Sequence, residues 1–281
     1  MAVDLHTHSI ASDGSESPTA LVEKAVAMGL SSMALTDHDT LEGIEEARNA
    51  AAGTHLELVP GTELSLDHDG GMHLVVLWLE PGPGPLQDRL ASLQDGRDRR
   101  NAAIVDLLKG LGMPLTMAEV TEESGSGSVG RPHIAAVMMR KGYVQSIAEA
   151  FDLWLGAGKP AYWGRPRLSP EEAIGLARAS GGVPVLAHPH TVGINRAAEM
   201  ADLLTMLRTA GLVGLEALCA GYHRHEREGY ADLARRFDLI ASGGSDYHGR
   251  YKPGLELGVG YGDLEVPDNV VEQLRAHARV G

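Results

Sequence analysis

The stretch Val3-Asp4-Leu5-His6-Thr7-His8 decides the fold of this 281-residue chain, because a short apolar run leads directly into two histidines. Similar runs precede further ionisable side chains at four later points, namely Asp37-His38, Glu63, His188 and Asp246-Tyr247-His248. A short apolar run bounded by Gly, Asp or Pro is typical of a buried strand. Polar residues just past the carboxyl ends of parallel strands form an active-site rim. The sequence therefore predicts one pocket that collects residues from both ends of the chain.

Strands and helices alternate over most of the sequence. Strands are expected over residues 2–6, 32–36, 57–61, 73–79, 183–187, 214–218 and 239–242. The third and fourth are separated by a short Asp- and Gly-rich turn, which predicts a hairpin. Six to eight strands with intervening helices favour an α/β fold of the closed (β/α) barrel type.

One long segment breaks this alternation. After the Pro- and Gly-rich residues 81–85, helices are expected over 86–110, 116–124, 131–141 and 146–155, with no comparable strand among them. We therefore expect a barrel domain formed by residues 1–83 and 166–281, and a helical insertion domain formed by residues 84–165.

Composition limits the classes of protein that this chain can belong to. A net charge of −14 argues against binding nucleic acid or membranes through charge alone. It does not exclude an anionic substrate, because bound cations would invert the local field. Cys219, the single cysteine, is expected to be a packed thiol in a reducing compartment. We see no signal peptide and no membrane-length apolar stretch, so we expect a cytoplasmic protein with no membrane partner. The sequence indicates no protein partner.

Imidazoles and carboxylates are the ligand types of a multinuclear metal site. Side chains two apart in a strand share a face, so His6 and His8 can reach the same ion. Glu63 has two oxygens and can bridge two ions. Asp13 is either a further ligand or the cap of the next helix.

Residues 36–40, Thr-Asp-His-Asp-Thr, hold three ionisable groups that are costly to keep together without a cation. We expect His38 to be the functional residue of this segment. Asp39 or Thr40 is expected to cap the helix that follows.

Five motifs together resemble those of the PHP (polymerase and histidinol phosphatase) superfamily. They are His6-Thr7-His8, Thr36-Asp37-His38, Glu63, Ala187-His188-Pro189 and Gly244-Ser245-Asp246-Tyr247-His248. The nearer likeness is to the stand-alone phosphoesterase branch, which includes 3′,5′-nucleotide bisphosphate phosphatases and 5′→3′ exoribonucleases. Gly130-Arg131-Pro132-His133 looks like a signature of that branch.

The resemblance implies a distorted seven-stranded (β/α) barrel with a helical insertion and two or three divalent metal ions. Manganese is expected first, with zinc, iron or magnesium as alternatives. The implied ligands are His6, His8, Glu63 and Asp246 for one ion, Asp13, His38 and His248 for a second, and Glu63 with His188 and His73 for a third. His133 is the alternative to His73 in the last position, and otherwise a substrate contact.

The activity implied is hydrolysis of a phosphate monoester, foremost the 3′-phosphate of a nucleoside 3′,5′-bisphosphate, with a hydroxide held by the metals as the nucleophile. His38, Asp13, His248 and Arg131 are expected to be catalytic. Arg131 would also clamp phosphate, with His133, Lys159 and Arg165 as further substrate contacts. Lys159 and Arg165 could equally be solvated surface charges.

Three other functions stay open from the sequence. The same site could trim short RNA from its 5′ end, and comparing adenosine 3′,5′-bisphosphate with a 5′-phosphorylated oligonucleotide as substrates would separate the two activities. Barrels with His-x-His motifs also support metal-dependent amidohydrolases. The last alternative is a non-catalytic module that binds nucleotides or metal.

Overall fold

The structure of the protein, a computed structural model, describes residues 2–68, 71–125 and 128–278. Within these residues seven strands form one sheet whose spatial order follows the chain, namely β1 (Val3–Asp4), β2 (Ser32–Leu35), β3 (Glu57–Ser65), β4 (His73–Leu77), β5 (Val183–Ala187), β6 (Gly214–Cys219) and β7 (Ile240–Gly244). The sheet curves until its two ends meet, because Leu5 N–H donates to the carbonyl of Gly243 at 3.2 Å and His8 N–H to that of Tyr247 at 2.9 Å. The predicted seven-stranded barrel is confirmed.

Strand direction places one further residue at the functional rim. All neighbouring strands are parallel except that β4 runs antiparallel to both β3 and β5. The first residue of β4, His73, therefore pairs with Ser65 and Ala187 at the carboxyl ends of its neighbours. The hairpin predicted between the third and fourth strands is confirmed, although its turn residues 69–70 lie outside the described part of the chain.

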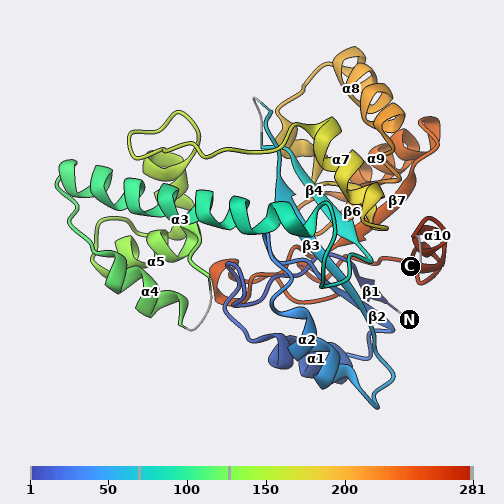
Figure 1. The fold of residues 1–281 in the computed structure, drawn as a ribbon, viewed down its shortest axis with the longest axis horizontal. Helices are drawn as coiled ribbons and strands as arrows, with labels where there is room; N and C mark the ends of the chain where they lie inside the picture. Colours follow the sequence, from blue (N-terminus) through green and yellow to red (C-terminus); the bar gives the residue numbers. More distant parts are fainter. Residues whose placement is uncertain (1, 69–70, 126–127, 279–281) are drawn as a thin grey trace.

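Helices cover the outside of the barrel (Figure 1). Those of the barrel part are α1 (Pro18–Ala27), α2 (Ile44–Ala51), α7 (Pro170–Ala179), α8 (Ala197–Ala210), α9 (Arg224–Arg236) and α10 (Asn269–Arg275). Ser17 caps α1 by accepting from Ala20 N–H at 3.1 Å, and Pro18 stands in the first turn, where no backbone donor is needed. No helix in the described residues is both long and apolar enough to cross a bilayer.

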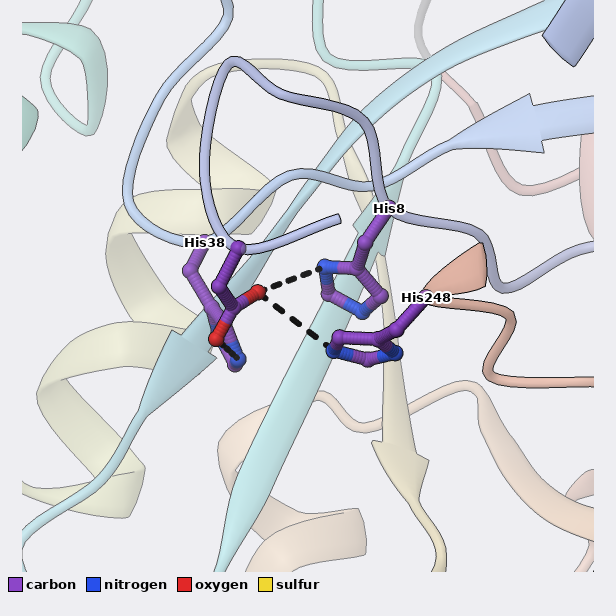
Figure 2. Close-up of side chains that lie close together, drawn as sticks. His8, His38 and His248 are labelled. Carbon is purple, nitrogen blue, oxygen red and sulfur yellow. Dashed lines mark ion pairs between the residues drawn. The ribbon is translucent and has the colours of Figure 1, made fainter. Parts of the chain in front are cut away.

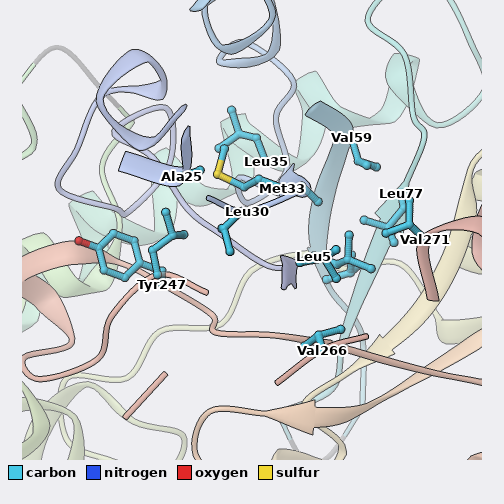
Figure 3. Packing of buried hydrophobic residues seen from close by; sticks show 14 of the residues in the cluster. Leu5, Ala25, Leu30, Met33, Leu35, Val59, Leu77, Tyr247, Val266 and Val271 are labelled. Carbon is cyan, nitrogen blue, oxygen red and sulfur yellow. The ribbon is translucent and has the colours of Figure 1, made fainter. Parts of the chain in front are cut away.

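Apolar side chains from the strands and the covering helices fill the barrel and its outer layer. Figure 3 shows part of one cluster, in which Leu5, Met33 and Val59 come from successive strand regions and pack with Leu77. All four are at most 2% exposed. Burial of this kind contributes about 25 cal/mol for each Å² of apolar surface removed from water. The rim residues therefore stand on a rigid scaffold.

The insertion has a hydrophobic core of its own. Helices α3 (Gln87–Gly110), α4 (Met117–Ser124), α5 (Arg131–Arg140) and α6 (Ile147–Ala150), followed by a π-helical turn over Phe151–Leu155, extend to one side of the barrel (Figure 1). A separate cluster of buried apolar side chains draws only on residues between 104 and 161. These features support the division into a barrel of 1–83 and 166–281 and an insertion of 84–165, which stays a proposal.

Among the local predictions that differ from the structure, two affect the site. Strand β3 continues to Ser65, past its expected end, because β4 pairs with its second half. Neither Asp39 nor Thr40 caps a helix, since α2 begins at Ile44 after Gly43. The Asp39 carboxylate turns instead toward the insertion, where two arginines hold it.

Candidate metal centre

Residues from seven separate segments meet at one end of the barrel. His6 and His8 follow β1, His38 follows β2, His188 follows β5 and Asp246 follows β7. The backbone at Gly244 packs closely against His6, which brings the two chain segments together. Glycine is needed there, because a Cβ atom at this position would lie 2.5 Å from the Cβ of His6. The structure therefore brings the two ends of the chain together at one site, as the sequence predicted.

The His6 and His8 imidazoles face each other with their Nε2 atoms 3.1 Å apart. The other ring nitrogen of His6 lies 2.9 Å from Glu216 Oε1, a carboxylate oxygen that can only accept. A neutral His6 therefore carries its proton on Nδ1, and its Nε2 lone pair points at His8. Such an arrangement is typical of a metal-binding imidazole oriented by an outer carboxylate.

Asp13 is the centre of a second group. Its carboxylate lies 3.7 Å from His8 Nδ1, 3.7 Å from His38 Nε2 and 3.4 Å from His248 Nε2. Figure 2 shows the three imidazoles turned toward this carboxylate. Asp13 does not cap the next helix, because Ser17 does so.

Glu63 lies between the histidines described above and a further pair, His73 and His188. Its Oε1 is 2.8 Å from His73 Nδ1 and 3.0 Å from His188 Nε2. Its Oε2 is 3.2 Å from His8 Nε2 and 3.2 Å from His38 Nδ1. The two oxygens thus face different histidines, which is the geometry that a bridging carboxylate requires.

Charge coupling among these groups is strong because their side chains are buried close together. Burial alone would raise the pKa of Glu63, but His38 and His73 hold it well below its usual range. Burial lowers the pKa of His38 well below its usual range. The pKa of His8 rises to about 9, because hydrogen bonds to Asp246 and Glu63 outweigh the opposing effect of burial. Divalent cations compete with such protons for the same donor atoms.

The donor set fits divalent metal ions. Three groups of side chains have donor atoms close enough together to hold an ion. The first group is His8, Asp13, His38 and His248, the second is His6, His8 and Glu63, and the third is His38, Glu63 and His73. The buried Nδ1 of His38 makes no hydrogen bond, although Glu63 lies beside it. A buried lone pair without a donor is costly, and a metal ion would satisfy it. The assignment of individual ligands remains a proposal.

Of the two candidates for the last ligand, the structure places His73 in the cluster. His133 is completely buried at the start of α5, where its Nδ1 accepts from Gly130 N–H at 2.9 Å. The α5 start nevertheless approaches the site, since a Cβ at Gly130 would lie 2.6 Å from the Cβ of Asp13. His133 is therefore placed beside the candidate ligands and outside their three donor groups.

The remaining predicted substrate contacts lie in the insertion. Arg131 donates to the carbonyl of Leu155 at 3.2 Å and stacks on the Phe151 ring. Arg165 donates to Asp39 at 2.6 Å, so it is not a solvated surface charge. Lys159 is exposed.

Sequence reasoning missed two residues of the site. Glu216 in β6 also accepts from His188 N–H, at 2.7 Å, and so orients two candidate ligands. It is the single charged residue of β6, Gly214–Cys219, and this isolation was a signal that could have been used. Lys252 lies in a loop and forms an ion pair with Asp246. Nothing in the sequence around Lys252 indicates this role.

Asp246 divides its two oxygens between different partners. Oδ1 faces the His6 and His8 rings at 3.7 and 3.5 Å, and Oδ2 contacts the Lys252 ammonium. The backbone of Asp246 is left-handed, with φ of 55°, and its N–H donates to the carbonyl of His6 at 2.9 Å. This sparsely populated conformation is held by the surrounding structure, as often occurs at functional sites.

The site opens into a cleft of about 300 Å³. The cleft is lined by His38, Glu63, His73, His188, His190, Thr191, Asp246, His248 and Lys252. It can admit a small anionic group next to the buried donors, with one ammonium on its wall.

Known proteins resemble this chain in both sequence and fold. The PHP domain family matches residues 4–96. A 5′-3′ exoribonuclease of Haemophilus influenzae is 34% identical over 95% of this chain and 96% of its own. A 3′,5′-nucleoside bisphosphate phosphatase of Chromobacterium violaceum is 30% identical over 91% of this chain and 90% of its own.

Two solved structures share the whole architecture. A protein from Bifidobacterium adolescentis, assigned as a metal-dependent phosphoesterase, superposes with a TM-score of 0.88 at 31% identity and covers 99% of this chain and 96% of its own. A Chromobacterium violaceum protein described as an amidohydrolase, with bound sulfate and no metal, superposes with a TM-score of 0.89 at 29% identity. The match covers 99% of this chain and 98% of its own.

Fold, buried donors and relatives together define a metal-dependent hydrolase of phosphoric esters. The chain belongs to the PHP family, in its stand-alone branch. The predicted family and enzyme class are thereby confirmed.

Proposed function

We propose that the protein hydrolyses a phosphate monoester of a small nucleotide, foremost the 3′-phosphate of a nucleoside 3′,5′-bisphosphate. The observation that carries the proposal is the meeting of buried imidazoles and carboxylates at a cleft wide enough for a phosphate, beside an arginine-bearing helix start. The bisphosphate phosphatase among the relatives is consistent with this substrate.

The proposed cofactor is two or three divalent ions, with manganese first and zinc, iron or magnesium as alternatives. When bound, such ions supply Lewis acidity toward phosphoryl oxygens and activate water. His6, His8, Asp13, His38, Glu63, His73, His188, Asp246 and His248 would hold them. Glu216 keeps His6 in the tautomer that leaves Nε2 free to bind.

Other residues prepare the site without contacting the ions. Asp37 accepts from the N–H of Ser9 at 2.8 Å and from the hydroxyls of Ser9 and Ser12 at 2.6 Å each. These bonds hold the loop that presents Asp13. Arg131 is proposed to bind phosphate from the insertion side, because this residue directly follows Gly130, which packs against Asp13.

Charge distribution favours a phosphate ester over an amide substrate. A phosphate ester is anionic, and the cleft has the Lys252 ammonium on its wall, while Arg131 follows Gly130 beside Asp13 and Arg165 bonds to Asp39 next to His38. A neutral amide would gain little from such groups. The amidohydrolase alternative is therefore not the proposed activity.

The second candidate is trimming of short RNA from its 5′ end, which the exoribonuclease relative favours. Both activities hydrolyse a P–O bond at a metal site. They differ in the ester that is attacked, which is a terminal phosphate monoester in the bisphosphate and a phosphodiester in RNA.

Two measurements test these proposals: phosphate release from adenosine 3′,5′-bisphosphate and from both adenosine monophosphates, and mononucleotide release from a 5′-phosphorylated oligonucleotide. Each assay is run on protein stripped of metal with a chelator and then supplied with manganese. We expect the bisphosphate to be turned over fastest and activity to return only with added metal. Mononucleotide release from the oligonucleotide at a higher kcat/KM would favour the exonuclease. Full activity in the stripped protein would refute the metal-dependent site.

A further inference from the structure

One histidine of the cleft has no place among the proposed metal ligands. His190 lies in the 3-10 helical turn Pro189–Val192, which follows β5. It is exposed, whereas the other four histidines that line the cleft are buried or half-buried. Among the described residues, His190 belongs to none of the three groups whose donor atoms could hold an ion. The proposed ligand set therefore leaves an accessible imidazole at the cleft without a role.

The side chain of Tyr222 holds His190 at two points. Its hydroxyl oxygen accepts from the backbone N–H of His190 at 3.2 Å and lies 3.0 Å from Nδ1 of the His190 ring. The two rings meet edge to face, with their centroids 5.0 Å apart and an angle of 84° between their planes. One side chain thus fixes both the backbone and the ring orientation of His190.

Tyr222 is itself a rigid support. It follows β6 in the chain and is only 4% exposed. Its ring stacks on that of Tyr230 in α9, with the centroids 4.9 Å apart. Burial raises the pKa of the Tyr222 hydroxyl, so the group keeps its proton. A buried tyrosine hydroxyl usually has a hydrogen-bond partner, and His190 supplies one here.

This contact leaves the other ring nitrogen of His190 as a donor. When the Tyr222 hydroxyl donates its proton to Nδ1, the proton of the neutral imidazole resides on Nε2. In the charged ring Nε2 carries a proton as well, so the donor is present in both protonation states. Within the described part of the chain, Nε2 of His190 makes no hydrogen bond. An N–H group is therefore available to a molecule that enters the cleft.

The ring of His190 lies close to the candidate ligand His188. The centroids of the two imidazoles are 6.2 Å apart, and their planes are inclined by 73°. His188 turns its Nε2 toward Glu63 at 3.0 Å, which directs that ring into the site. A phosphate group bound beside His188 is therefore close enough to contact His190 too. Hydrogen bonds to a charged oxygen are among the strongest that a side chain can make.

We infer that His190 is a substrate-binding residue, whose Nε2–H group donates to an oxygen of the phosphate that is hydrolysed, and that Tyr222 is the positioning residue that orients it. The inference rests on one part of the proposed function, the binding of a phosphate ester in the cleft, and not on which nucleotide carries the phosphate. It also distinguishes His190 from a metal ligand, because a nitrogen that carries a proton has no lone pair for an ion.

Inorganic phosphate is the probe, because it isolates this contact from the nucleoside. Its affinity for the manganese-loaded protein is measured by calorimetry. We expect His190→Ala to bind phosphate about 10- to 100-fold more weakly than the wild type, the range for a hydrogen bond to a charged group. His190→Gln should restore most of the affinity, because its amide can place an N–H donor near the position of Nε2. His225→Ala is the matched control and should bind like the wild type, since His225 is exposed on α9 and does not line the cleft.

A double-mutant cycle tests the role assigned to Tyr222. Tyr222→Phe keeps the ring and removes only the hydroxyl, and it should weaken phosphate binding about 2- to 10-fold. In the His190→Ala background the same change should have no further effect, because Tyr222 acts on phosphate only through His190. A general structural role would weaken binding equally in both backgrounds, and that result would overturn the positioning role.

The outcomes separate this inference from the proposed activity. Equal phosphate affinity in the wild type and His190→Ala would overturn the inference. Fewer bound manganese ions per chain in His190→Ala would also overturn it, because His190 would then be a ligand. Hydrolysis of the bisphosphate with the same KM in both proteins leaves the activity standing and refutes the inference. Phosphate binding that depends on His190, without hydrolysis of any nucleotide, does the reverse.

Discussion

Glu216→Gln should weaken metal binding although Gln has almost the same shape as Glu. In the protein, one Glu216 oxygen accepts from His6 Nδ1 at 2.9 Å and the other accepts from His188 N–H at 2.7 Å. A glutamine offers one acceptor where two are needed. Its amide group would face a second donor, and His6 would relieve the conflict by moving its proton to Nε2.

That tautomer removes the lone pair that points toward His8, 3.1 Å away. Loss of an outer-shell partner typically costs 10- to 100-fold in metal affinity or activity, which corresponds to about 1.4 to 2.8 kcal/mol. We expect a loss in this range for manganese, measured by titration of the stripped protein and by the metal concentration that gives half-maximal turnover.

Glu228→Gln is the matched control, because Glu228 is exposed on α9 and pairs with Arg224 on the same helix. It should bind metal like the wild type. Unchanged metal affinity in Glu216→Gln, with correct folding shown by circular dichroism, would refute the tautomer argument.

Three further predictions concern the same region. Asp246→Ala should lower turnover by more than the roughly 100-fold expected for an outer contact, with the fold retained, and wild-type-like turnover would contradict the site. Lys252→Met should raise KM about tenfold or more, because the cleft loses the ammonium on its wall that would attract an anionic phosphate. Lys252→Arg should restore most of the lost affinity, and an unchanged KM in Lys252→Met would remove Lys252 from the site. Asp39→Asn should destabilise the fold by about 3 kcal/mol, because Arg97 and Arg165 lose their carboxylate. These arginines lower the pKa of Asp39 below its ordinary 3.8, although burial opposes them. The difference in unfolding free energy between wild type and variant should therefore be constant near neutral pH and shrink below about pH 3.8, as measured by urea titrations. A difference that grows in acid would show that Asp39 is not held ionised.

Local patterns in the sequence were enough to predict most of the side chains that meet at the candidate site. His6, His8 and His38 follow apolar runs, and a polar group at the end of a buried strand lies at the rim of a barrel wherever its partners are in the sequence. His73 was a harder case. It begins its strand, and only the antiparallel direction of β4 brings it to the same rim.

The sequence could not assign Asp39. Its position just before a helix favoured a cap, since side chains of this type commonly bond to nearby backbone N–H groups. In the protein a long-range charge prevails, because Arg97 and Arg165 reach it from the insertion. Sequence spacing carries no information about a partner 58 or 126 residues away.

By itself, the sequence determined the barrel, the helical insertion, the family and the imidazole and carboxylate side chains of the site. Each of these depends on a residue type and its immediate neighbours. Only the tertiary structure decided that Glu216 orients His6, that Lys252 reaches the cleft, and that Tyr222 bonds to His190. These roles depend on the distance between side chains and on the exclusion of water, and both are set only when the whole chain has folded.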